Sequence, residues 1–341
     1  MLADELISDY SKLHGDYSVY RIHGAEGIDL FVNRMRAAHK FILTDDTYAM
    51  VASILKEKPS KLVSSIEYAK APYPLTWVER ISTGTGFSDA RPATRKVGYL
   101  IEALPNDRYL ISMAYSFRDG GKQTNLNPMS FIYDASITSE EFAAIVDYAR
   151  SLVTEDEINE LQQYRKEIGV AKSIQEASDA LAAGLSDKEK IIGENLGARF
   201  LSVPCPYLIG TTKFMESKLD KKKFMMLQSD WVADWCGEVM IAMGVFILLN
   251  CKNAVNLEPS DLDKLNAARM KKGRVPLCDY HVVDINLKAA EDALPHGMDG
   301  PEKRMHWRRG HFKRRKTGLY WWSPHLAGRK ELGFVEKHYA V

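Results

Sequence analysis

Hydrophobic positions in residues 1–60 recur at helical spacing. Within 27–36, four apolar residues fall on one face of a helix with 3.6 residues per turn, and these are Ile28, Phe31, Val32 and Met35. The pattern predicts two or three amphipathic helices at the start of the chain.

The pattern changes at 71–81, which begins with two prolines and then becomes rich in β-branched and aromatic residues. Residues 97–104, 109–116 and 129–133 have the same character. Turn-forming sequences separate these segments at 105–107 and 119–121. We therefore expect an antiparallel sheet of about four strands after the helical start.

Helical patterns return in the second half of the chain. Capping-box sequences begin at Thr138 and predict helices over 138–200. The most apolar helix is expected at 224–251, and a further helix is expected from Glu258 to about Gly273. After it the pattern predicts strands at 280–287, 305–313, 319–325 and 333–340. Because helices and strands cluster and do not alternate, the predicted fold class is α+β.

Charge divides the chain more sharply than hydropathy does. Residues 301–341 contain 11 Lys and Arg against three acids, whereas residues 1–300 contain 35 against 42. The same 41 residues contain four of the nine His and three of the six Trp. With a length of 341 residues, two domains are expected. We predict an acidic α+β body at 1–274, with a possible internal boundary near 135, and a basic, aromatic β module at 275–341.

Neither a leader nor a membrane span is expected. The first ten residues lack the basic and apolar regions of a signal peptide. The longest apolar run, 239–249, is too short to cross a bilayer. The four cysteines have no C-x-x-C spacing, which favours reduced thiols over disulfides or zinc. The predicted location is the cytoplasm of a host cell.

Candidate chemistry concentrates in the basic module. If 305–313 is one strand, Trp307, Arg309, His311 and Lys313 share one face and His306, Arg308 and Phe312 the other. Lys316-Thr317-Gly318 would then turn the chain into a second strand. Guanidinium and ammonium groups neutralise phosphates, and aromatic rings stack on unpaired bases. The expected nucleic-acid-binding residues are Arg308, Arg309, His311, Lys313, Arg314, Arg315, Trp321, Trp322 and His325. Strand alternation should turn either Trp321 or Trp322 inward.

Other readings of these residues stay open. His306 and His311 are candidate general acid and base residues for RNA cleavage, although structural histidines are the more common case. No zinc-type spacing and no phosphate-binding loop is present, so neither a metal site nor a cofactor is expected. A second basic cluster at 269–274 either complements a helix C-terminus or extends the same positive surface.

The segment 306–312, His-Trp-Arg-Arg-Gly-His-Phe, followed by Tyr-Trp-Trp-Ser-Pro at 320–324, resembles the closing motif of a family of phage and mobile-element proteins that includes a type V-A anti-CRISPR. The resemblance covers about 40 residues. Phe312 stands where the family usually has Trp, and the chain continues further after Pro324. The resemblance implies counter-defence by repression of a target at the mRNA level during translation, with recognition of an emerging peptide.

Three functional hypotheses follow. The first is a phage-type repressor whose basic module engages RNA or a ribosome–nascent-peptide complex, while its body recognises a host or defence protein. The second is a metal-independent ribonuclease that uses His306 or His311. The third is a non-enzymatic protein-binding or virion-associated module whose basic hairpin contacts an acidic partner.

Overall fold

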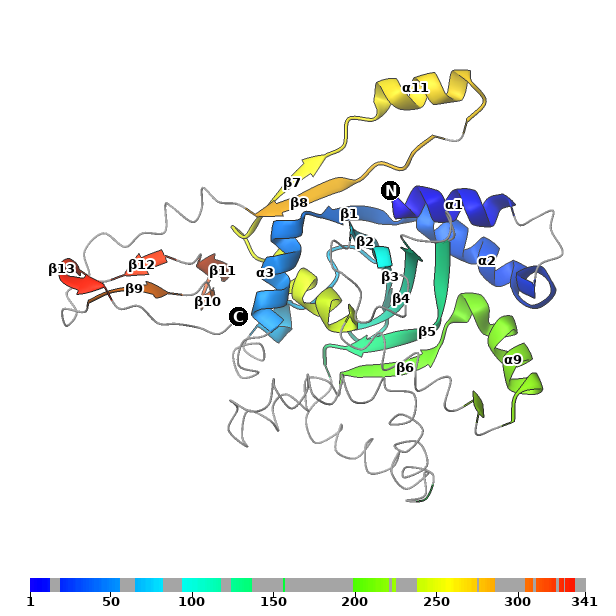
Figure 1. Cartoon of the computed structure of the whole chain (residues 1–341), viewed down its shortest axis with the longest axis horizontal. Coiled ribbons are helices and arrows are strands. Elements are labelled where there is room, and N and C mark those ends of the chain that lie inside the picture. The colour runs from blue at the N-terminus through cyan, green and yellow to red at the C-terminus, as the bar shows by residue number, and fades with distance from the viewer. Residues whose placement is uncertain are drawn as a thin grey trace.

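The fold is built on one large sheet with helices on both faces (Figure 1). The computed structural model describes residues 1–12, 19–55, 65–81, 94–117, 124–136, 156, 199–220, 223–224, 238–274, 276–285, 304–308, 311–322, 325–327 and 329–334. The helices predicted between 138 and 198 lie outside these residues, apart from Asp156. The α+β class predicted from the sequence is confirmed.

The eight-stranded sheet has the order β6-β5-β4-β3-β2-β1-β8-β7. The four predicted strands are its centre, and each pairs antiparallel with the next: β2 (Leu75–Ile81), β3 (Thr94–Leu104), β4 (Arg108–Phe117) and β5 (Thr124–Asp134). β6 (Phe200–Pro204) pairs antiparallel with β5. Residues 137–198 therefore connect two neighbouring strands, so the chain returns to the same sheet beyond the boundary considered near 135.

The sheet is mixed because of one strand that the sequence pattern did not predict. β1 (His39–Leu43) lies between α2 (Val19–Ala37) and α3 (Asp45–Leu55), in a region expected to be helical throughout. It pairs parallel with both β2 and β8 (His281–Ile285). The predicted antiparallel arrangement is confirmed for β2–β5, and the two parallel pairings come from β1, because α3 crosses over between β1 and β2.

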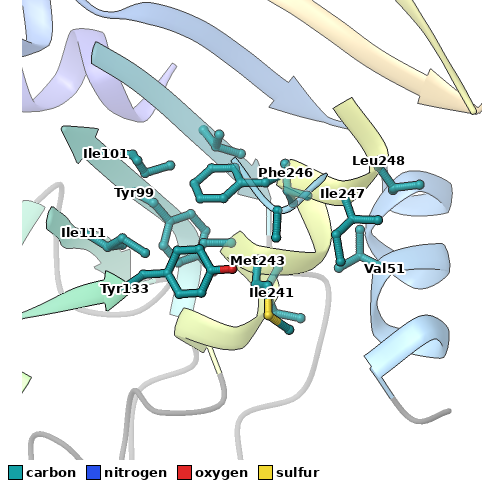
Figure 2. Close-up of a cluster of buried hydrophobic side chains, with 14 of the residues drawn as sticks. Val51, Tyr99, Ile101, Ile111, Tyr133, Ile241, Met243, Phe246, Ile247 and Leu248 are labelled. Carbon is teal, nitrogen blue, oxygen red and sulfur yellow. The ribbon is translucent and has the colours of Figure 1, made fainter. Parts of the chain in front are cut away.

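Strand alternation divides the core into two layers. On one face, Trp77 of β2 packs with α1 (Leu2–Lys12) and α2, and the four α2 residues predicted to share a face are all buried. On the other face, Val78 packs with Val51 of α3 and with the helix at 238–249. Figure 2 shows Phe246 and Leu248 of this helix beside Tyr99 of β3 and Val51. The remainder of the predicted apolar helix, 225–237, lies outside the described residues.

A buried carboxylate attaches α1 to the sheet. The side-chain oxygens of Glu79 accept hydrogen bonds from the backbone N–H groups of Leu2 and Ala3, both at 3.0 Å, and from the Trp77 indole at 2.8 Å. The first N–H groups of a helix have no partner within the helix and attract negative charge. Three donors therefore compensate the burial of a charge that is only 5% exposed.

The predicted helix at 258–273 begins later than expected. Glu258 and Pro259 belong to β7 (Val255–Pro259), which pairs with β8 at the edge of the sheet, and α11 spans Asp263–Lys271. Its N-cap is Leu262, and no side chain caps it. The predicted end is confirmed, because Gly273 adopts a φ of +64° just beyond the helix. We call β7, α11 and β8 the arm, and Figure 1 shows it projecting from the body.

β8 falls within the range predicted for the basic module, 275–341, but it is a strand of the large sheet. Downstream strands form two small sheets: β10 (His311–Arg315) with β11 (Gly318–Trp322), and β12 (His325–Ala327) with β9 (Arg304–Arg308) and β13 (Arg329–Phe334). The strand predicted at 305–313 is therefore two strands in separate sheets. No helix within the described parts of the chain is long and apolar enough to cross a membrane.

Candidate nucleic-acid interface

The β10–β11 hairpin contains the most basic of the described strands. Its strands pair antiparallel from His311 opposite Trp322 to Arg315 opposite Gly318. The turn falls at Lys316 and Thr317, as the sequence predicted. Gly318 follows with a φ of +130°, a conformation that side chains with a Cβ rarely adopt.

The two faces of this hairpin differ in the side chains that they bury. Leu319 and Trp321 are 1% and 5% exposed, and both belong to the core that also contains the helix at 238–249. Lys313 and Arg315, which pair with Tyr320 and Gly318, alternate onto the opposite face, where both side chains are exposed. We call Lys313, Arg315 and Tyr320 the basic face. The register places the positions of His311 and Trp322 on the same side.

Contacts within the basic face order its aromatic ring. The Arg315 guanidinium carbon lies 5.3 Å from the centre of the Tyr320 ring, which is cation–π range. The Tyr320 hydroxyl is 3.0 Å from the hydroxyl of Thr317 in the turn. A ring held between a cation and a hydrogen bond is a suitable surface for an unpaired base, since aromatic stacking contributes about 1–3 kcal/mol per base.

The turn after the 238–249 helix fixes the hairpin to the body. The Asn253 side chain brackets one residue of β11: its amide nitrogen donates to the Trp321 carbonyl at 3.0 Å, and its oxygen accepts from the Trp321 N–H at 2.9 Å. The Lys252 N–H donates to the Leu319 carbonyl at 3.2 Å. Cys251 is buried beside this contact, and burial raises the pKa of its thiol to about 11.

Lys252 adds a cation that the sequence analysis missed. A Cβ placed on Gly318 would lie 3.2 Å from the Cε of Lys252, so this side chain extends along the turn end of the hairpin. Lys252 is exposed and lies 61 residues or more from the basic face in sequence. The contact is long-range, and no local pattern signals it.

Trp321 was predicted to bind nucleic acid, and this prediction is wrong. Its side chain packs in the core, where no base can reach it. The related prediction that alternation turns one of the two tryptophans inward is confirmed for Trp321. Arg314, another candidate, is exposed but pairs with Leu319 and so lies on the other face of the hairpin from Lys313 and Arg315.

The remaining candidates are only partly described. Arg309 and Gly310 lie outside the described residues, as do the side chains of His306, Arg308, His311, Trp322 and His325. The register of β9 and β12 pairs Arg308 with His325 and His306 with Ala327. Because β9 and β10 belong to different sheets, the continuous faces expected across 305–313 do not form. His306 and His311 therefore lie on strands of separate sheets.

A second charged cluster is buried in the body. The Arg80 guanidinium donates to Glu238 at 2.6 Å and lies 4.0 Å from the centre of the Tyr48 ring. The Tyr99 hydroxyl donates to the other oxygen of Glu238 at 2.5 Å. Burial, and then the charge of Glu238, raise the pKa of Tyr99 well above its usual value. The cluster joins β2, β3, α3 and the 238–249 helix, which is a structural role.

Comparison with known proteins adds no identification, because no protein family, no curated protein and no solved structure matches the chain. Among the described residues there is no group of three or more His, Cys, Asp and Glu side chains suited to a metal ion.

Proposed function

We propose that this protein binds single-stranded RNA through the basic face and represses a target at the mRNA level. The observation that supports the proposal is the two-sided hairpin. Leu319 and Trp321 fix it in the core, while two cations and an ordered ring face outward on one side. Cations that neutralise phosphates, next to an aromatic platform, are the elements of sequence-tolerant binding to single strands.

The second part of the proposal rests on the resemblance of 306–312 and 320–324 to the anti-CRISPR family. In this proposal the body recognises a host or defence protein, or its emerging peptide on the ribosome. The hairpin then engages the RNA of the same complex. Asn253 and Lys252 join the body to the hairpin by hydrogen bonds, which supports a proposal in which one part recognises the target and the other contacts RNA.

The experiment is a titration of labelled single-stranded RNA at several salt concentrations. Log affinity should fall linearly with log salt, with a slope near −0.7 per phosphate contact. Lys313→Ala combined with Arg315→Ala should weaken binding and make the slope shallower by about 1.4. The matched control is Lys213→Ala with Lys218→Ala on α9 (Ile209–Lys218), which removes the same charge from exposed positions elsewhere.

Three results would count against the proposal. Equal salt slopes for the double variant and its control would show that Lys313 and Arg315 make no phosphate contacts. Salt-insensitive binding to a protein, with no RNA copurifying, would favour a protein-binding module. Cleavage of purified RNA in the presence of a chelator would favour a metal-independent ribonuclease.

In cells, crosslinking followed by sequencing of the attached RNA should recover the target mRNA.

A further inference from the structure

The helix at the end of the arm is not stabilised by burial. None of the α11 residues is buried, and a nine-residue helix on its own is marginal in water. Hydrogen bonds stabilise it instead. The Asn266 side chain, within α11, brackets Leu277 in the segment that leads to β8, donating to its carbonyl at 3.0 Å and accepting from its N–H at 2.8 Å. The chain thus maintains an exposed helix at the end of the arm.

The C-terminal end of α11 has the hydrogen bonds of a Schellman motif. The Gly273 N–H donates to the Met270 carbonyl at 3.0 Å, and the Arg274 N–H donates to the Arg269 carbonyl at 2.9 Å. The motif brings together two positions that usually make an apolar contact. Here both are arginines. Like charges are placed where stability favours apolar side chains, which indicates a use other than stability.

The helix dipole explains part of this charge but not all of it. Cations in the last turn of a helix are stabilised by the helix dipole, and the effect fades beyond that turn. Lys272 and Arg274 lie past the end of α11 and are exposed, as is Lys271 in the last turn. We call Arg269, Lys271, Lys272 and Arg274 the basic tip.

The basic tip and the basic face are separate surfaces. Figure 1 shows α11 well apart from β10 and β11, so the cluster does not extend the surface of the hairpin directly. The large exposed apolar residues of α11 are Leu265 and Met270, at 49% and 58%. They are five residues apart, and a spacing of five does not place two side chains on one helical face. A basic surface without an apolar stripe favours a polyanion over a packed protein interface.

We propose that the basic tip is a second phosphate-contact surface for the RNA that the basic face binds, so that one RNA strand touches both. This inference rests on the proposed function. It predicts that RNA length matters, because only a strand long enough to reach from the hairpin to the arm gains from the basic tip. The contact is electrostatic, so the gain should be independent of sequence and sensitive to salt.

The test compares two oligouridine probes, of about 8 and about 40 nucleotides, since a single binding surface occupies about 4–16 nucleotides. The triple variant Lys271→Ala, Lys272→Ala, Arg274→Ala should bind the short probe as the native chain does. It should bind the long probe about tenfold more weakly, with a salt slope shallower by about two. The Lys213→Ala, Lys218→Ala control should bind both probes normally.

The outcomes separate this inference from the proposed function. If the triple variant binds the long probe normally while Lys313→Ala with Arg315→Ala weakens it, the inference is wrong and the proposed function stands. If the native chain binds neither probe, both are wrong. Equal losses on short and long probes would make the tip the primary site and overturn the inference. Polyglutamate serves as a third probe. If the triple variant loses binding to polyglutamate but binds both RNA probes normally, the tip contacts an acidic polypeptide and the inference is wrong.

Discussion

Asn253→Ala should weaken the attachment of the hairpin to the body. The substitution removes both hydrogen bonds that bracket Trp321, at 3.0 and 2.9 Å. Each such bond contributes about 0.5–1.5 kcal/mol net, so the free energy of unfolding should fall by about 1–3 kcal/mol. RNA binding through the basic face should weaken as well, because the strand that holds Tyr320 loses two of the hydrogen bonds that attach it to the body.

Asn266→Ala is the matched control for this prediction. It removes the same bidentate bracket from Leu277, with bonds of 3.0 and 2.8 Å. Since no residue of α11 is buried, the global free energy of unfolding should change by no more than about 0.5 kcal/mol. The two substitutions are chemically identical, so any difference between them reports the place of the bracket in the fold.

Urea denaturation followed by tryptophan fluorescence measures both variants, and hydrogen exchange reports the Trp321 amide directly. In Asn253→Ala this amide should exchange faster than in the native chain, and in Asn266→Ala it should not. Equal destabilisation by the two substitutions, or an unchanged Trp321 amide in Asn253→Ala, would refute the assignment of Asn253 as the attachment of the hairpin.

Three further substitutions test the body. Gly98→Ala should cost about 1–3 kcal/mol in thermal denaturation, because its Cβ would lie 2.1 Å from the Trp77 ring; native stability would mean that the ring moves aside. Glu238→Gln should lower the free energy of unfolding, because Arg80 stays buried without a counter-charge. The loss should be below the value of about 3–5 kcal/mol for a fully buried pair, since the Glu238 side chain is 24% exposed; a loss under about 0.5 kcal/mol in urea denaturation would contradict this. The pKa of the buried Cys251 thiol is raised from 9.0 to about 11, so its contribution is fully present below pH 9 and is lost between pH 9 and 11 as the unfolded thiol ionises. Cys251→Ala should flatten the stability profile over that interval, and an unchanged profile would show that the thiol is not the cause.

The sequence predicted the elements that depend on neighbouring residues or that have a strongly periodic hydrophobic pattern. The apolar face of α2 and the central strands β2–β5 are predictable because their apolar residues recur at the spacing of a helix or a strand. The turn at Lys316 was foreseen from its polar sequence between two extended segments, and the inward side of Trp321 followed from alternation. These features need no knowledge of distant partners.

The elements that the sequence analysis missed depend on distant partners. β1 has only five residues, and the partners that make it a strand, β2 and β8, lie far along the chain. Pro259 resembled a helix start but ends the edge strand β7, where its missing N–H is tolerated. The roles of Asn253 and Lys252 arise from contacts across more than 60 residues. No periodicity reports such contacts.

The most direct test of the central claim is ultraviolet crosslinking of the protein to single-stranded RNA, with mass-spectrometric identification of the attached peptides. The basic face predicts a crosslink on Tyr320, within the tryptic peptide 317–329, that weakens in the Lys313→Ala, Arg315→Ala variant and persists in the Lys213→Ala, Lys218→Ala control. Crosslinks confined to peptides of the body, with 317–329 unmodified, would contradict the account.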